Sequence, residues 1–280
     1  APAASGASWR RAGGVLCVDV RRPCEWAGEQ KLEDLFRGIS RCGRVASVTF
    51  HGCASSQEED YYACDSCGFI VGQWVHLLLD NPALRELKCN ACEFTGTALS
   101  ALADVVRKHA GLALLQLVNC DCAEDTSTSP GLFQVQLAVA ESPSVAAFRL
   151  QFPCAVSPRH CDFCFAGFGS VSPELLQRRL RTNHVLAEVD IDSLDSRFGG
   201  AHADQKGASR RLADGRSWNA CRRFLMEAAA RNRELAELWR RAAPVARHSR
   251  APAVRRAGSS RRTGEAAARG LTLKGVDITA

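Results

Sequence analysis

The sequence of 280 residues predicts an α/β solenoid, in which short parallel strands alternate with helices and each strand–helix unit stacks on the next. Two observations lead to this prediction. A short pattern of alternating apolar residues recurs six times along the chain, and segments with apolar residues at helical spacing lie between its copies. Consecutive parallel strands need a crossover connection, and an intervening helix provides one.

The strand pattern consists of an apolar residue, two free positions, an apolar residue, one free position and a third apolar residue. After two further positions comes Cys, Pro or another apolar residue. The copies read VLCVDVRRP from Val15, VASVTFHGC from Val45, LRELKCNAC from Leu84, LALLQLVNC from Leu112, VAAFRLQFP from Val145 and LAEVDIDSL from Leu186. The third and fourth copies start 28 residues apart, which indicates a unit of about 28 residues with insertions elsewhere. A weaker seventh match, LAELWRRAA, starts at Leu235.

Helix patterns follow the strands. Residues 29–40 and 97–109 each place apolar side chains on one helix face. Ser172 and Pro173 form a helix start signal, and Ser217 is expected to cap a further helix. His109 lies at a predicted helix end, where the helix dipole favours a cation. Polar turns precede the next strands at Asn81, Ser142, Asn183 and Asn232, and the polar segment 201–215 is predicted to be a loop.

The segment NPALRELKCNACEFTGTALSALADVVRKHAG resembles one repeat of the ribonuclease-inhibitor-like leucine-rich repeat family. The segment NACRRFLMEAAARNRELAELWRR resembles the terminal helix that closes such arrays. The chain departs from the family through insertions at 53–68 and 154–171 and through Val or Ala at several Leu positions. The resemblance predicts a repeat domain of about six units over residues 15–241. Residues 1–14 are expected to be a flexible flank, and residues 242–280 a disordered basic tail.

The 14 cysteines do not form a framework typical of secreted disulfide proteins, so we expect a reducing, cytoplasmic compartment. The resemblance places Cys53, Cys92 and Cys120 at the repeat position whose side chain bonds the backbone of the bend after the strand. Cys89 is expected to face the core as a small hydrophobic residue. An alternative is zinc binding by the two CxxC pairs of the insertions, Cys64 with Cys67 and Cys161 with Cys164.

The formal charge of +6 comes from the tail, because residues 242–280 hold eight basic and two acidic side chains and the remainder is balanced. A neutral folded part argues against nucleic acid as the main partner, leaving weak contacts by the tail. The sequence contains no glycine-rich phosphate loop, GxSxG or HExxH motif, so we predict neither an enzyme nor a cofactor.

In a curved solenoid the strands line a concave face, and side chains at the same strand position form lateral rows across it. We predict that this face binds another protein, with an apolar centre and a polar rim. The predicted contact residues are Asp19, Thr49, His51, Glu86, Lys88, Asn90, Leu114, Gln116, Val118, Arg149, Gln151 and Asp190. The alternatives are an ordinary solvated sheet face, a GTPase-activating-protein-like regulator of a small GTPase, a zinc-stabilised adaptor, or a substrate adaptor of a ubiquitin ligase.

Overall fold

The structure is a computed structural model that describes residues 6–12, 15–23, 29–52, 71–122, 131–151, 171–191 and 205–248. The chain forms two compact units, Ala1–Leu238 and Trp239–Ala280. The first unit contains the sheet and its covering helices. In the second unit the described residues, 239–248, form the end of the last helix. Among the described residues, no helix is both long and apolar enough to span a membrane.

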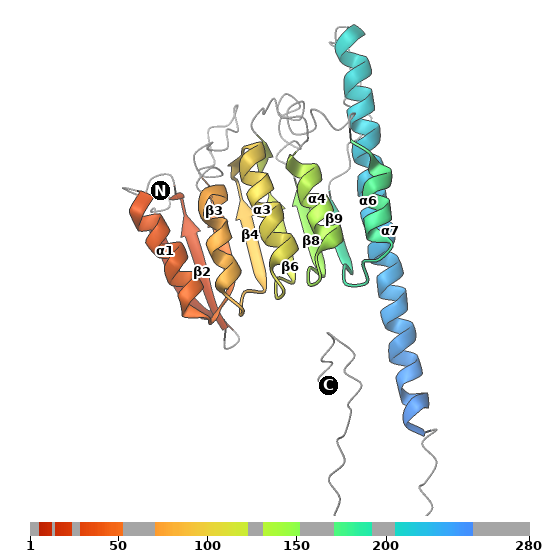
Figure 1. The fold of residues 1–280 in the computed structure, drawn as a ribbon, viewed down its shortest axis with the longest axis horizontal. Helices are drawn as coiled ribbons and strands as arrows, with labels where there is room; N and C mark the ends of the chain where they lie inside the picture. The colour runs from red at the N-terminus through yellow and green to blue at the C-terminus, as the bar shows by residue number, and fades with distance from the viewer. Residues whose placement is uncertain are drawn as a thin grey trace, which may run out of the picture. The chain divides into compact units, whose positions relative to one another are not determined.

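A seven-stranded sheet forms the centre of the first unit (Figure 1). Its strands lie in chain order: β1 (Gly6–Ala12), β2 (Val15–Arg21), β3 (Val45–His51), β4 (Glu86–Asn90), β6 (Leu114–Val118), β8 (Ala147–Gln151) and β9 (Glu188–Ile191). The strands from β2 to β9 are parallel, whereas β1 pairs antiparallel with β2. All six predicted strands are therefore present, and the predicted α/β architecture of parallel strands alternating with helices is confirmed.

Helices cover one face of this sheet (Figure 1). They are α1 (Glu29–Cys42), the 3-10 helix η2 (Val75–Asp80), α3 (Gly96–Lys108), α4 (Gly131–Glu141) and α6 (Pro173–Leu180). The last helix, α7 (Gln205–His248), contacts the β9 end of the sheet through Arg222 and Arg233. The helices predicted at 29–40, at 97–109 and from Pro173 are confirmed. Ser172 occupies the N-cap position of α6, but its hydroxyl donates to the Glu174 carboxylate at 2.9 Å instead of capping a backbone N–H.

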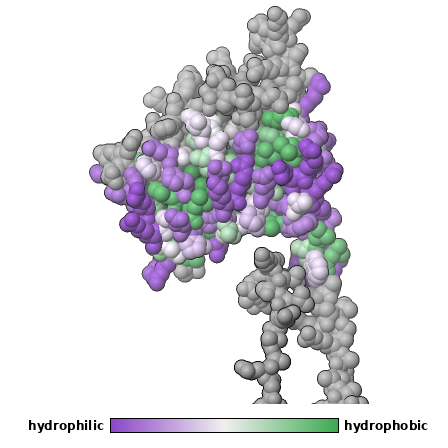
Figure 2. Space-filling view, viewed as in Figure 1, coloured by the Kyte–Doolittle hydropathy of each residue, from purple (hydrophilic) through white to green (hydrophobic). Residues whose placement is uncertain are grey.

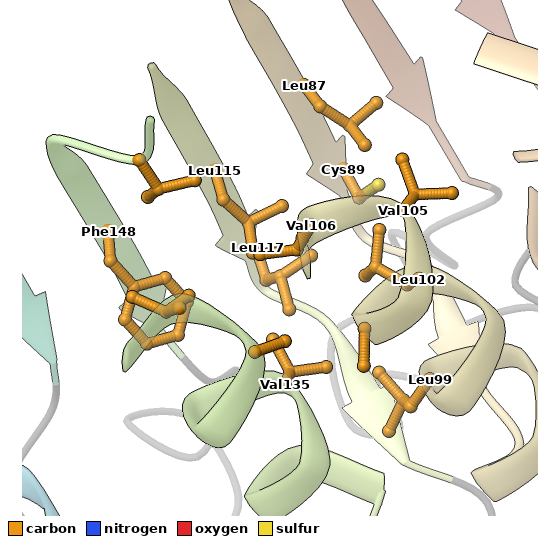
Figure 3. Close-up of a cluster of buried hydrophobic side chains, with 14 of the residues drawn as sticks. Leu87, Cys89, Leu99, Leu102, Val105, Val106, Leu115, Leu117, Val135 and Phe148 are labelled. Atoms are coloured by element: carbon orange, nitrogen blue, oxygen red, sulfur yellow. The ribbon is translucent and has the colours of Figure 1, made fainter. Parts of the chain in front are cut away.

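The core lies between the sheet and the helices (Figure 3). The inward residues of β4 and β6 meet the apolar side of α3, and Phe148 of β8 and Val135 of α4 belong to the same buried cluster. In the N-terminal part of the same core, the ring of Phe36 from α1 stacks on the ring of Phe50 from β3, with 5.3 Å between the ring centroids. Each fully buried Leu or Phe contributes roughly 1.5–3 kcal/mol, so this continuous layer holds neighbouring units together.

Buried polar side chains hold the turns that precede several strands of the sheet. Asn81, His109, Ser142, Asn183 and Asn232 are all less than 6% exposed. The Asn81 amide donates to the Val45 carbonyl at 2.9 Å, and its oxygen accepts from the Ala83 N–H. Asn183 makes four such backbone bonds. Because buried backbone groups need partners, these side chains stabilise the turns that set the start of each strand.

His109 belongs to this set, and the prediction of a cationic His109 is wrong. Its Nε2 lies 3.0 Å from the Asn81 carbonyl, so it donates there, while Nδ1 accepts from the Gly111 N–H at 3.1 Å. A ring that donates through one nitrogen and accepts through the other is neutral. Burial lowers the pKa of His109, because desolvation disfavours the charged form more than the hydrogen bond to the Asn81 carbonyl favours it.

Sharp bends follow the strands, with Arg22, Ala91 and Asn119 in the left-handed region. The Cys120 thiol donates to the Cys89 carbonyl at 3.3 Å, and the Cys92 thiol donates to the Asn90 carbonyl at 3.5 Å. The predicted roles of Cys92 and Cys120 are therefore confirmed, and Cys53 lies outside the described residues. Cys89 is fully buried as predicted, and burial raises its pKa well above the ordinary value, so it stays a thiol.

Several predictions about the ends of the domain differ from the structure. Residues 6–12 of the flank expected to be flexible form β1, because β2 offers them an open edge for backbone pairing. Residues 205–215 are helical instead of a loop, so Ser217 lies inside α7 and caps nothing. The weak match at Leu235 is also helical, and so is Asn232, where a turn was predicted. Helix α7 continues to His248, seven residues past the predicted boundary at 241.

Candidate functional site on the open face of the sheet

The sheet face opposite the helices is the one predicted to be concave, and we call it the open face. Strand register brings its outward side chains into lateral rows. The middle row is Asp19, Thr49, Lys88, Gln116, Arg149 and Asp190. The row on one side is Arg21, His51, Asn90, Val118 and Gln151, and the row on the other side is Cys17, Ser47, Glu86, Leu114, Ala147 and Glu188. All twelve predicted contact residues therefore share one surface.

The alternation of burial explains this placement. In β4, β6 and β8 the second and fourth residues are buried and the others are partly exposed. Successive side chains of a strand point to opposite faces, so the apolar pattern that fills the core also fixes which side chains reach the open face.

Most described charges of the open face lie in pairs. Arg10 contacts Asp19 at 2.9 Å, Lys88 contacts Glu86 at 2.6 Å and Arg149 contacts Glu188 at 2.5 Å. The hydrogen bond from Lys88 lowers the pKa of Glu86, so this carboxylate stays charged at neutral pH. On the three described rows and Arg10, four basic side chains face four acidic ones, and the surface carries no net charge.

Uncharged side chains occupy the middle of the open face. Leu114 and Val118 stand on β6 with Gln116 between them, and Ala147 lies beside Leu114 on β8. All four are partly exposed. Because ion pairs occupy the strands on either side, β6 forms an uncharged strip between two charged flanks.

His51 lies on the β2 side of this strip. It is partly buried, and its Nδ1 lies 3.5 Å from the Asn90 side-chain nitrogen. Burial lowers the pKa of His51 even though Asp19 acts in the opposite direction. A neutral His51 offers a partner both a donor and an acceptor without a desolvated charge.

The sequence prediction missed the contribution of β1 to this surface. Ser8 pairs with Asp19 and Arg10 with Cys17, so both side chains extend the open face beyond β2. The signal was present as alternation in GASWRRA, but the segment is short and its single strong apolar residue is Trp9.

The structure places no metal site on this surface. Within the part of the chain that it describes, no group of three or more His, Cys, Asp and Glu side chains could hold a metal ion. The zinc candidates Cys64, Cys67, Cys161 and Cys164 all lie outside the described residues.

No family model matches the sequence, and no curated protein matches it. Several solved structures are similar in fold, and two of them serve as examples. One is the tropomodulin C-terminal domain of Caenorhabditis elegans, with 10% identity and a TM-score of 0.43, covering 76% of this chain and 98% of that chain. The other is leiomodin-1 actin-binding site 2, with 11% identity and a TM-score of 0.39, covering 77% and 99%. Similarity at this level carries no conclusion about what this chain binds.

Proposed function

We propose that the chain is a protein-binding module and that the open face is its contact surface. The observation that carries the proposal is the uncharged strip of β6, formed by Leu114, Gln116 and Val118, between the ion pairs of β4 and β8–β9. Protein interfaces combine a poorly charged centre with a polar rim that excludes water and fixes orientation.

The charge balance of the open face favours a protein over a nucleic acid. A surface that binds nucleic acid needs unbalanced Lys and Arg to release counterions from phosphates. Here Lys88 and Arg149 are held by Glu86 and Glu188, and neither pair leaves a net positive charge. The tail retains the basic excess of the sequence and is the part expected to make weak contacts with acidic partners.

We also propose that the units are of ribonuclease-inhibitor-like type. Support comes from the strand–helix composition of the unit and from the 28-residue step between the starts at Leu84 and Leu112. The thiol contacts of Cys92 and Cys120 in the bends support a reducing, cytoplasmic environment, since those cysteines act as hydrogen-bond donors. The alternatives of a GTPase regulator and of a zinc-stabilised adaptor gain no support from the described residues.

The test is binding by the full chain with the strip made charged. The double variant Leu114→Arg and Val118→Arg alters the centre of the open face. A matched control, Val185→Arg with Met226→Arg, places the same two charges on exposed apolar residues elsewhere, which are 36% and 40% exposed. A partner captured from lysate by the parent chain is purified, and its affinity for each form is measured by calorimetry.

We expect the strip variant to bind at least about tenfold more weakly than the control, since central apolar contacts carry much of the affinity of an interface. Both variants should keep the circular dichroism of the parent. Equal affinity of the two variants would refute the assignment of the open face and point to the helix side. Figure 2 views that side, where the surface is mainly hydrophilic with smaller hydrophobic patches.

A further inference from the structure

The two ends of the sheet differ in how their backbone is satisfied. At the β9 end, Arg222 donates through Nε to the Ile191 carbonyl at 2.7 Å, and Arg233 donates through Nη1 to the Ala187 carbonyl at 2.8 Å. At the opposite end lies β1, and the described part of the chain contributes no strand beyond it. An edge strand directs alternate N–H and C=O groups away from its sheet, so β1 offers an extended polypeptide a row of backbone partners.

The exposed side chains of β1 are basic and aromatic. Its sequence GASWRRA contains Arg10 and Arg11 and no acidic residue. Arg11 is exposed and has no ion-pair partner among the described residues. Arg10 contacts Asp19 at 2.9 Å, yet its side chain remains 64% exposed. Trp9 is 46% exposed, although its cross-strand neighbour Val18 is fully buried. The strand therefore presents two arginines and an indole ring at its open edge.

Charge is distributed unevenly along the sheet, although the open face as a whole is balanced. Strands β1 and β2 together carry Arg10, Arg11 and Arg21 against the single acid Asp19. Strand β9 carries two acidic residues and no basic one. Opposite charges on neighbouring strands stabilise the pair, whereas like charges directly opposite each other destabilise it. The β1 edge therefore favours an acidic strand and disfavours a basic one, including a second copy of β1.

We propose that β1 is a docking edge for an extended acidic segment of a partner protein, which adds to the sheet as a further strand. In this mode of recognition, main-chain hydrogen bonds supply affinity and alternate side chains supply specificity. The excess of arginine at this edge makes the segment acidic. The row of backbone donors and acceptors makes it a polypeptide, since a phosphate polymer could use the charges but not the alternating N–H and C=O groups.

The alternation of side chains along β1 specifies the sequence that fits. Arg10 pairs with Cys17 of the open face, whereas Trp9 and Arg11 lie on the helix side of the sheet. An antiparallel segment then needs two consecutive acidic residues, one opposite each arginine, followed by an apolar residue opposite Trp9. One carboxylate of such a segment lies on each face of the sheet. The expected order along the partner is acid, acid, apolar.

This edge is separate from the strip proposed as the contact surface of the open face. Three strands lie between β1 and β6. Neighbouring strands are about 4.8 Å apart, so the two surfaces are about 19 Å apart. A change at Arg11 should leave binding through Leu114 and Val118 intact. Either proposal can therefore fail without the other.

The test is fluorescence anisotropy of the full chain with a labelled heptapeptide, Thr-Glu-Glu-Val-Thr-Val-Thr, which has the required order. The control peptide, Thr-Glu-Glu-Val-Pro-Pro-Thr, keeps the same charge and the same acid, acid, apolar order. Successive N–H groups of a strand point to opposite sides, so two adjacent prolines remove at least one N–H directed at β1. We expect the prolines to weaken binding at least about tenfold, whereas nonspecific attraction to the basic tail would treat both peptides alike.

On the protein, Arg11→Glu is the disrupting variant, because it reverses an exposed charge of β1 without removing a buried contact. Arg181→Glu is the matched control, since it makes the same change of charge at an exposed arginine at the end of α6. We expect Arg11→Glu to weaken binding of the heptapeptide at least about tenfold and Arg181→Glu to change it less than about twofold. Trp9→Thr keeps a residue suited to strands and should also weaken binding.

All three variants should keep the circular dichroism of the parent chain. Absence of binding by the heptapeptide overturns the proposal. Equal affinity of the two peptides also overturns it, because the attraction would then depend on charge and not on strand pairing. Equal affinity of Arg11→Glu and Arg181→Glu would place the contact away from β1, as expected of a peptide held by the tail.

Discussion

Replacing Asn183 with alanine removes the side chain that connects three elements of the array. Its amide nitrogen donates to the carbonyls of Val139 and Ala140 at the end of α4, at 3.3 and 3.0 Å. Its amide oxygen accepts from the N–H groups of Val185 and Leu186 at 3.0 and 2.9 Å, in the turn before β9. The residue is 5% exposed, so solvent has little access to these groups.

The expected magnitude follows from the groups that lose their partner. The Val139 carbonyl still accepts from the Ser142 N–H at 3.3 Å, so it keeps one bond. The other three groups, the Ala140 carbonyl and the N–H groups of Val185 and Leu186, lose the bond that Asn183 gives them. At about 1 kcal/mol for each, Asn183→Ala should lower the free energy of unfolding by about 3 kcal/mol.

The assay is equilibrium unfolding in urea followed by circular dichroism. Thr182→Ala is the control, because Thr182 is exposed and its hydroxyl donates only to the Arg179 carbonyl, so its loss should change stability by less than about 0.5 kcal/mol. The loss of unfolding free energy for Asn81→Ala should lie between those for Asn183→Ala and Thr182→Ala, since the Asn81 side chain makes two hydrogen bonds to the backbone. A loss below about 1 kcal/mol for Asn183→Ala would show that these turns do not depend on buried side-chain bonds.

Three further predictions concern single sites. Ala91 has a φ of 54°, in the left-handed region that favours glycine. Ala91→Gly should therefore raise the free energy of unfolding, measured in urea, by about 0.5–1 kcal/mol. A lower free energy of unfolding would show that the backbone is not strained at Ala91. Both side-chain polar atoms of Gln136 are buried without a hydrogen-bond partner among the described residues. Gln136→Met should therefore raise the melting temperature, and an unchanged or lower melting temperature would contradict this prediction. His109 has a folded pKa below its ordinary 6.5, so the unfolded chain binds more protons and stability should fall as pH drops below about 6.5. His109→Asn should reduce that fall relative to the exposed control His76→Asn, and equal pH dependence would refute a neutral buried ring.

The sequence determined the strands and their lateral rows. A period of two fixes which residues face the core, and six copies of one pattern align those residues across neighbouring strands. The rows through Lys88, Gln116 and Arg149 could therefore be predicted from the chain alone. Helices 29–40 and 97–109 were predictable for a similar reason, because each keeps a single apolar face toward the sheet.

Other features depended on contacts that the local sequence does not encode. Helix α4 is buried on nearly all sides between α3, α6 and the sheet, so it has no amphipathic pattern by which to recognise its face. The flank at residues 6–12 becomes a strand only because β2 has a free edge. His109 is neutral because the fold buries it, and this desolvation lowers its pKa although the hydrogen bond to the Asn81 carbonyl acts in the opposite direction.

The ends of the array show the difference most clearly. The sequence at Leu235 repeats the strand pattern, yet the segment is helical, because α7 continues through it. Two arginines of α7 donate hydrogen bonds to backbone carbonyls at the last strand. A periodic pattern indicates which residues share a face of a strand or helix. Only the tertiary structure decided where the array of strand–helix units ends, because the backbone groups at the edge of β9 need hydrogen-bond partners from either another strand or a side chain.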